Sequence, residues 1–161
     1  MTVLPIRLWP EAILSEVCAP VGQDDMSRLA FDMLETMYAA PGRGLAGPQV
    51  GVARAMFVMD VTWKEGMPAP RIFLDPEVLW SSPVCVMGPE GCLSIPGVTT
   101  MVSRAEAVRI GWRDLSGARQ EETLTGFAAI CAQHEIDHLC GVVTLDHLSP
   151  EARAQAVAAI A

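Results

Sequence analysis

The chain has 161 residues and a net charge of −8, and 51% of its residues are hydrophobic against 19% that are charged. This length is enough to bury a core, and we expect one domain over residues 1–161. The acidic balance, without a cluster of Lys and Arg, argues against direct binding of nucleic acid. Because no apolar run could cross a bilayer and the first residues lack the pattern of a secretory signal, we expect a cytoplasmic protein with no membrane partner.

The first predicted helix covers residues 26–39, where apolar residues recur every four positions. This pattern is typical of an amphipathic helix that packs one face on the core. Asp24 and Asp25 precede the helix as candidate N-caps, and the Pro41-Gly42 pair is expected to stop it.

Strands are predicted in the middle of the chain. Short apolar runs at residues 55–60 and 72–74 are typical of buried strands. Residues 108–112 alternate between apolar and polar side chains, which predicts a half-buried strand, and a turn should follow at residues 114–117. Because strands follow one another instead of alternating with helices, we expect an α+β domain with antiparallel or mixed sheets.

Two more helices are predicted towards the C-terminus. One covers residues 127–139 and should end at Gly141, because glycine is common just after the last turn of a helix. A short helix should follow Ser149 and Pro150, since serine caps helices and proline is tolerated in the first turn.

The second of these three helices carries the pattern His134-Glu135-x-x-His138. Positions i and i+4 lie on one helix face about 6 Å apart along the axis, so both imidazoles can reach one metal ion. The glutamate beside them can take a proton from a water on that ion, as in H-E-x-x-H hydrolases. Asp137 and Arg104 are a candidate supporting pair, because metal ligands usually need hydrogen-bonded neighbours that orient them.

A catalytic metal site needs a third protein ligand. The five cysteines are irregularly spaced in a chain with no export signal, which indicates free thiols or metal ligands rather than disulfides. Cys131 shares the helix face but lies seven residues before His138, about 10 Å along the axis, and Cys140 points away. His147 fits no ligand pattern and is expected on the surface or in a hydrogen bond.

Cys92 is the best candidate elsewhere in the chain. Gly91 beside it would let the backbone approach an ion, and the Pro96-Gly97 pair would form a turn just beyond. A cysteine in a turn is, however, more often a small buried residue than a ligand. The residues alone therefore leave the third ligand open.

Three stretches together resemble the peptide deformylase family. They are residues 42–49 (GRGLAGPQ), 90–94 (EGCLS) and 133–138 (QHEIDH), and their order and spacing are similar to the pattern of that family. The resemblance implies an α+β fold in which sheets surround a central metal-binding helix. It also implies an enzyme that removes the formyl group from the N-terminal formyl-methionine of newly made proteins.

The resemblance implies a role for each matching residue. Cys92, His134 and His138 would bind one divalent ion, with Fe²⁺ expected and Zn²⁺, Ni²⁺ or Co²⁺ as alternatives, and Glu135 would be the acid and base. The side chain of Gln49 and the backbone N–H of Leu93 would stabilise the oxyanion. The residues expected to bind substrate, with the last three forming the methionine pocket, are Arg43, Gly44, Glu90, Gly91, Phe127, Ile130 and Cys131.

Some positions differ from the usual family pattern. Arg43 stands in place of an apolar residue, Thr99 in place of an arginine, and Gly88-Pro89 in place of an apolar-acidic pair, while Gly47 replaces an alanine and should loosen its loop. These changes keep open a paralogue that acts on another small N-acyl amine, and a non-catalytic metal or peptide binder. The expected partners are N-formyl-methionyl peptides or nascent chains.

The end of the chain also differs from the pattern of many family members, which carry a basic C-terminal helix. After Pro150 the charged residues are Glu151 and Arg153. Because so little positive charge is present, docking on the ribosome by a basic helix is not expected.

Overall fold

The computed structural model of the protein describes residues 2–160. Within this range the helices are α1 (Ser27–Ala39), α2 (Gly126–Leu139) and α3 (Pro150–Ile160). The strands are β1 (Gly44–Ala46), β2 (Met56–Met59), β3 (Arg71–Ser81), β4 (Cys85–Cys92), β5 (Ile95–Ala105), β6 (Ala107–Arg113) and β7 (Arg119–Thr125). The predicted α+β class is confirmed.

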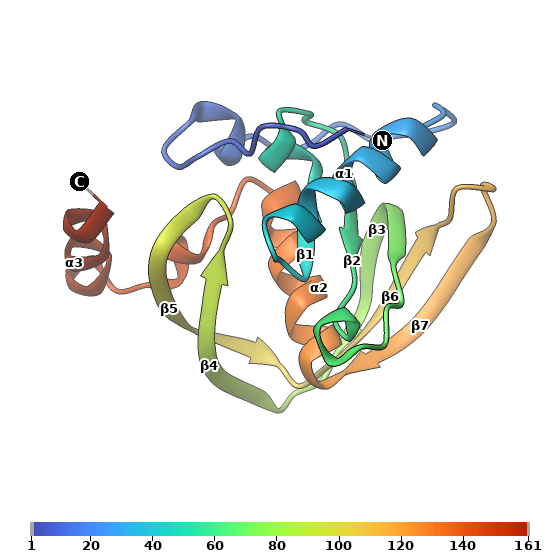
Figure 1. The fold of residues 1–161 in the computed structure, drawn as a ribbon. Coiled ribbons are helices and arrows are strands. Elements are labelled where there is room, and N and C mark those ends of the chain that lie inside the picture. The colour runs from blue at the N-terminus through green and yellow to red at the C-terminus, as the bar shows by residue number, and fades with distance from the viewer. Residues whose placement is uncertain (1, 161) are drawn as a thin grey trace.

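Two antiparallel sheets surround α2. One has five strands in the order β1-β2-β3-β6-β7, and the other is the hairpin β4-β5. In Figure 1, α2 lies between the hairpin and the larger sheet, α1 lies above them, and α3 lies beyond β5. Within residues 2–160, no helix combines the length and the apolar character that a membrane crossing requires.

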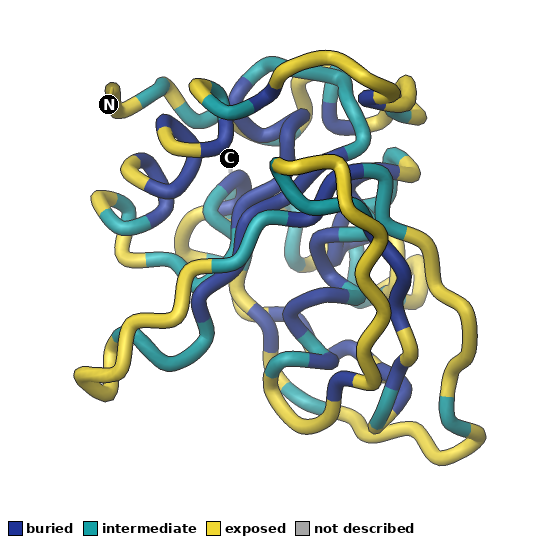
Figure 2. The backbone as a smooth tube through the Cα atoms, turned by 90° about the vertical axis from the view of Figure 1, so that its right-hand side faces the viewer, coloured by how far each residue is buried: buried dark blue, intermediate teal, exposed yellow. Residues whose placement is uncertain are grey.

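The main core lies between the larger sheet and α2. Its centre is an aromatic stack in which the rings of Phe57 and Phe73 are 4.4 Å apart and those of Phe73 and Trp112 are 4.6 Å apart. Each buried aromatic side chain of this kind contributes about 1.5–3 kcal/mol by leaving water. Figure 2 shows the buried segments gathered inside the molecule and the exposed ones at its edges. This core holds α2 in a fixed position behind β1 and β2.

The predicted ends of the helices are confirmed to within one residue. α1 begins at Ser27, whose backbone N–H and hydroxyl both donate to Asp25 Oδ1 at 3.0 and 2.6 Å. The N-cap position itself is Met26, so the prediction that Asp24 or Asp25 occupies it was wrong. α2 ends at Leu139, and Gly141 follows with a φ of 75°, in the left-handed region that favours glycine. Ser149 Oγ accepts the N–H of Ala152 at 3.2 Å and so caps α3.

The strands differ more from the prediction than the helices do. The run at residues 72–74 is only the start of β3, and β1, β4, β5 and β7 were not predicted. β7 has one buried side chain, Leu124, on an otherwise exposed edge strand, so it has no apolar alternation. The turn expected at Pro96-Gly97 was also wrong, because the hairpin turns at residues 93–94 and Pro96-Gly97 lie within β5.

Candidate active site

The two strongest sequence signals meet at one place in the fold. Cys92 is the last residue of β4, and His134 and His138 lie one turn apart on α2. The thiol sulfur and one nitrogen of each imidazole all lie within 4.8 Å of one another, and Cys92 Sγ is 3.5 Å from His138 Nε2. Cys131 is not part of this group. The structure therefore brings together the three residues that the resemblance implied as ligands.

His134 is oriented by a buried charged network. Its Nδ1–H donates to Glu90 Oε1 at 2.9 Å, which leaves Nε2 to face the other two ligand atoms. Both oxygens of Glu90 also accept from Arg104, at 2.8 and 2.9 Å, and Arg104 donates to Asp137 Oδ2 at 2.6 Å. The expected pair of Asp137 and Arg104 is therefore present. His147 is hydrogen-bonded as expected, with Nε2 2.7 Å from Asp137 Oδ2.

This network gives Glu90 a role in addition to the predicted one, which is contact with the substrate. Burial works against its charge, but the hydrogen bonds from Arg104 and His134 hold the pKa of Glu90 down at about 2. Through these hydrogen bonds the carboxylate orients His134, and because Glu90 also lines the cavity, its contact with the substrate stays a prediction. No local pattern in the sequence marks this role, because it depends on Arg104, which lies 14 residues further along the chain.

Glu135 is buried beside Cys92, His134 and His138, which together form the predicted ligand group. Burial raises its pKa to about 7, and its Oε1 has no hydrogen-bond partner among residues 2–160. β1 passes so close to it that a Cβ added at Gly44 would lie 2.5 Å from Glu135 Oε2 and 2.8 Å from Cys131 Sγ. A larger residue at position 44 would therefore displace the ends of Glu135 and Cys131, and the strand closes one side of the carboxylate.

The surroundings of the imidazoles suit a metal ion. Burial lowers the pKa of His138 to about 3, so this ring is neutral and able to coordinate. Burial alone would lower the pKa of His134, but the Glu135 carboxylate and hydrogen bonds with Cys92 and Glu90 raise it. Negative groups that favour a proton at this position also favour a divalent cation. A thiolate and two imidazoles are a donor set that suits zinc, iron, cobalt or nickel.

The close approach of the backbone to an ion at Gly91 stays a prediction. A Cβ added at this position would have no heavy atom of the described residues within 4 Å. Gly47 shows the opposite, because a Cβ at this position would lie 2.7 Å from Val52 O and 2.8 Å from Arg54 O. The loop packs tightly around Gly47, and its entropic loosening stays a prediction.

One cavity of about 630 Å³ connects the expected site residues. All of them except the deeply buried His138 line it. Gln49 is fixed at its inner end, where Nε2 donates to Ser94 Oγ at 3.1 Å and lies 3.7 Å from Cys92 Sγ. Its Oε1 accepts the N–H of Ala46 at 2.9 Å. The amide therefore presents its donor end towards the ligand group.

The outer part of the cavity combines apolar and basic side chains. Phe127 is 49% exposed and belongs to the wall of the cavity rather than to the core, while Ile130 and Cys131 are more buried. The guanidinium of Arg43 lies 5.1 Å from the centre of the Phe127 ring. Lys64 also lines the cavity and was missed, because it lies in a loop without any pattern that marks a site.

Comparisons with known proteins point to one family. Residues 3–154 match the family model described as polypeptide deformylase. The chain is 48% identical over 151 residues to a peptide deformylase of Alkalilimnicola ehrlichii, covering 92% of this chain and 84% of that protein. It is 42% identical over 159 residues to one of Phenylobacterium zucineum, covering 98% and 94%.

Solved structures give the same result. A peptide deformylase from Legionella pneumophila superposes with a TM-score of 0.92 at 35% identity, covering 99% of this chain and 94% of that one. The enzyme from Thermotoga maritima superposes with a TM-score of 0.87 at 36% identity, covering 93% and 100%. The chain therefore belongs to the peptide deformylase family.

Proposed function

We propose that this protein is a metal-dependent amide hydrolase that removes the N-formyl group from the formyl-methionine at the start of newly made peptides. The observation that carries the proposal is the meeting of Cys92, His134 and His138 beside the buried Glu135 at the inner end of one cavity. Relatives named peptide deformylase over most of the chain support it. Because newly made formylated chains arise in the cytoplasm, we place the activity there.

Cys92, His134 and His138 would hold one divalent ion, and Fe²⁺ is the ion we propose. When bound, such an ion supplies a Lewis acid that lowers the pKa of a water and polarises a carbonyl oxygen. Glu90 keeps the Nδ1 proton of His134 in place, so the other nitrogen of that ring stays available as a ligand.

Glu135 would move the proton. An oxygen without a hydrogen-bond partner and a pKa raised to about 7 by burial are suited to a group that must both take and release a proton near neutral pH. Glu135 accepts the proton of the attacking water and delivers it to the amine nitrogen, so that the carbon–nitrogen bond breaks and formate leaves.

Gln49 and Leu93 would stabilise the negative charge that develops on the formyl oxygen. The amide of Gln49 is held by Ala46 and Ser94, so its donor needs no reorganisation during the reaction. Leu93 is the first residue of the hairpin turn and lines the cavity, and we assign its backbone N–H as the second donor.

The peptide would bind along β1. This strand is at the edge of its sheet, paired with β2 on one side only, and Gly44 lines the cavity. An extended peptide can add to such an edge through backbone hydrogen bonds. The methionine side chain would then face Phe127, Ile130 and Cys131, where an unbranched, polarizable chain can adapt to an irregular wall.

A second candidate is hydrolysis of a different small N-acyl amine. Arg43 places a guanidinium against Phe127 in the wall where an apolar group would suit methionine better, and Thr99 also lines the cavity. Such changes alter which substrate binds best without touching the ligand group.

We also infer that α3 provides no basic docking surface for the ribosome. Glu151 and Arg153 are the charged residues between positions 150 and 160, and Arg153 is 3.8 Å from Asp146 in a salt bridge.

Kinetics on matched peptides test the proposal. The protein is loaded with Fe²⁺ under nitrogen and given formyl-Met-Ala-Ser, acetyl-Met-Ala-Ser and a formyl peptide that begins with another residue. Formate release from the first, with little acetate from the second, is the expected result. Preference for the acetyl peptide would favour the second candidate, and no cleavage of any amide would leave a metal or peptide binder. Actinonin, which was solved in complex with the peptide deformylase from Ehrlichia chaffeensis, is expected to inhibit.

A further inference from the structure

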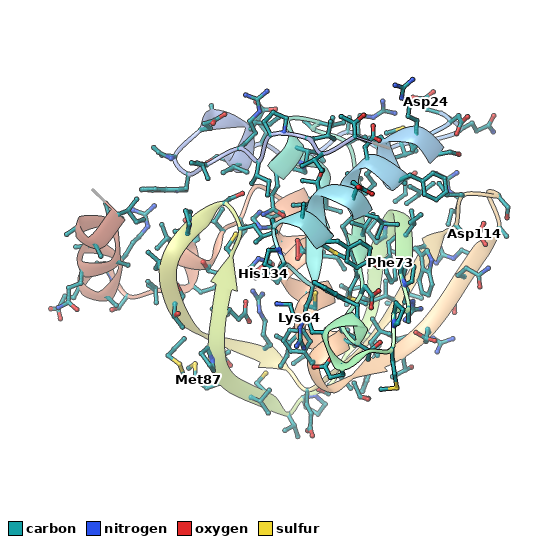
Figure 3. All side chains as sticks on the ribbon, in the orientation of Figure 1. Asp24, Lys64, Phe73, Met87, Asp114 and His134 are labelled. Atoms are coloured by element: carbon teal, nitrogen blue, oxygen red, sulfur yellow. The ribbon has the colours of Figure 1, made fainter. Side chains whose placement is uncertain are left out.

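Lys64 is the only lysine of the chain, and its side chain is exposed at the mouth of the cavity. It forms no salt bridge with the acidic groups of residues 2–160, and its Nζ lies 5.7 Å from the centre of the Trp63 ring. Figure 3 shows Lys64 below His134, and both residues line the same cavity. An uncompensated cation therefore lies at the cavity of a protein whose net charge is −8.

The loop around Lys64 is held firmly in place. Lys64 lies in the short 3-10 turn η3 (Trp63–Glu65), and the indole N–H of Trp63 donates to Gly42 O at 2.9 Å. The Trp63 ring packs edge-on against Tyr38 at 5.2 Å, and Tyr38 donates to Asp60 Oδ2 at 2.6 Å. These contacts tie the turn to the segment before β1, so Lys64 has a defined position relative to the path of a peptide.

The nearest acidic neighbour does not cancel this charge. Glu65 Oε1 accepts from Arg43 Nη2 at 2.9 Å, and Arg43 also donates to Val61 O at 3.3 Å. Glu65 does not line the cavity, whereas Arg43 and Lys64 do. Of the two acidic groups further in, Glu90 is compensated by Arg104, and Glu135 lies buried at the inner end, away from the mouth. The mouth of the cavity is therefore positive on balance, although the protein is acidic.

The inference that follows depends on the proposed function. A peptide that pairs antiparallel with β1, with its formyl end at the ligand group, runs from Gly44 towards Gly42 and Lys64. We propose that Lys64 is a specificity-determining residue that binds a carboxylate of the substrate just beyond the methionine. The carboxylate could belong to an Asp or Glu side chain in the second or third position, or to the C-terminus of a short formyl peptide.

Matched peptides distinguish these sources. The first pair is formyl-Met-Asp-Ala-amide and formyl-Met-Asn-Ala-amide, and the second moves Asp and Asn to the third position. The third pair compares formyl-Met-Ala with its amide. In at least one pair we expect kcat/KM of the parent protein to be about two- to fivefold higher for the carboxylate, the range of an exposed ion pair. The pair that shows this preference identifies the source.

Two variants and a control test the residue itself. Lys64→Gln should abolish the preference and Lys64→Glu should reverse it, because a like charge repels the carboxylate. Arg28→Gln removes one positive charge from an exposed position outside the cavity and should keep the preference. The inference would be overturned if both Lys64 variants kept the parent protein's preference in kcat/KM for the carboxylate peptide, or if Arg28→Gln lost that preference.

The same peptides separate this inference from the proposed function. Calorimetry on the metal-loaded Glu135→Gln variant measures their affinities without turnover. If the parent protein cleaves no formyl peptide, the proposed function fails, and a carboxylate preference in Kd that depends on Lys64 still supports the inference. If all peptides are cleaved and bound equally, the function stands and the inference fails.

Discussion

Replacing Arg104 with methionine should cost the protein a large part of its stability. Arg104 is 5% exposed and makes two hydrogen bonds to Glu90 and one to Asp137. Methionine has a similar length but no charge, so the substitution leaves Glu90 buried without its cation. Breaking a buried ion pair from one side typically costs about 3–5 kcal/mol.

The lowered pKa of Glu90 gives a second way to work out how much this network contributes to the free energy of unfolding. Its value falls from 4.5 to about 2, and each unit corresponds to about 1.4 kcal/mol, so the network favours the charged form by about 3 kcal/mol. Because the folded-state pKa is lowered, this contribution is fully present above pH 4.5 and disappears as the pH falls towards 2. The difference between parent and variant should therefore shrink over that window.

Urea unfolding of metal-free protein at pH 7 measures the effect. Arg119→Gln is a matched control, because Arg119 forms exposed salt bridges with Glu77 and Glu121 that are worth less than about 1 kcal/mol. The reasoning would be refuted if Arg104→Met lowered the free energy of unfolding by no more than Arg119→Gln does. If the difference in unfolding free energy between parent and Arg104→Met stayed constant from pH 5 to pH 2.5, the effect could not be assigned to the charge of Glu90.

Two further predictions concern the carboxylate beside the ligand group. Glu135→Gln should keep its metal, measured by metal analysis, but lose about 10²–10⁴-fold in kcat, because the amide cannot take a proton; comparable rates would exclude the proton-transfer role. Gly44→Ala should destabilise the protein by about 1–3 kcal/mol in the same urea assay, because the added methyl group would lie 2.5 Å from Glu135 Oε2. Gly88→Ala is its control, since a Cβ there meets no heavy atom within 4 Å, and equal losses in the two variants would contradict the close approach.

The helices and two of the three grouped residues could be predicted from local sequence alone. His134 and His138 share one helical turn, so the regular geometry of α2 is enough to bring them together. The ends of α1 and α3 depend on Asp25 and Ser149, whose side chains bond backbone groups two or three residues away. Interactions of such short range leave a clear pattern in the chain.

Features that depend on distant contacts could not be predicted in this way. Cys92 is 42 residues from His134, and only the resemblance to a family pointed to it. β4 contains Gly88 and Pro89, which strands usually avoid, and it forms because β5 pairs with it along its whole length. The role of Glu90 depends on Arg104 from the facing strand, and that of Lys64 on a loop that is fixed by Trp63.

The hairpin of β4 and β5 shares no strand ladder with the larger sheet, yet it supplies the sulfur while α2 supplies both imidazoles. Coordination of an ion would therefore add a link between two parts of the molecule that are already joined by side-chain packing, by the Glu90 network and by the hydrogen bonds between the Gln133 side chain and the backbone of Ala105. Binding of a metal would therefore hold the hairpin in place against α2, in addition to its chemical role. It would also fix the width of the opening through which a peptide reaches Glu135.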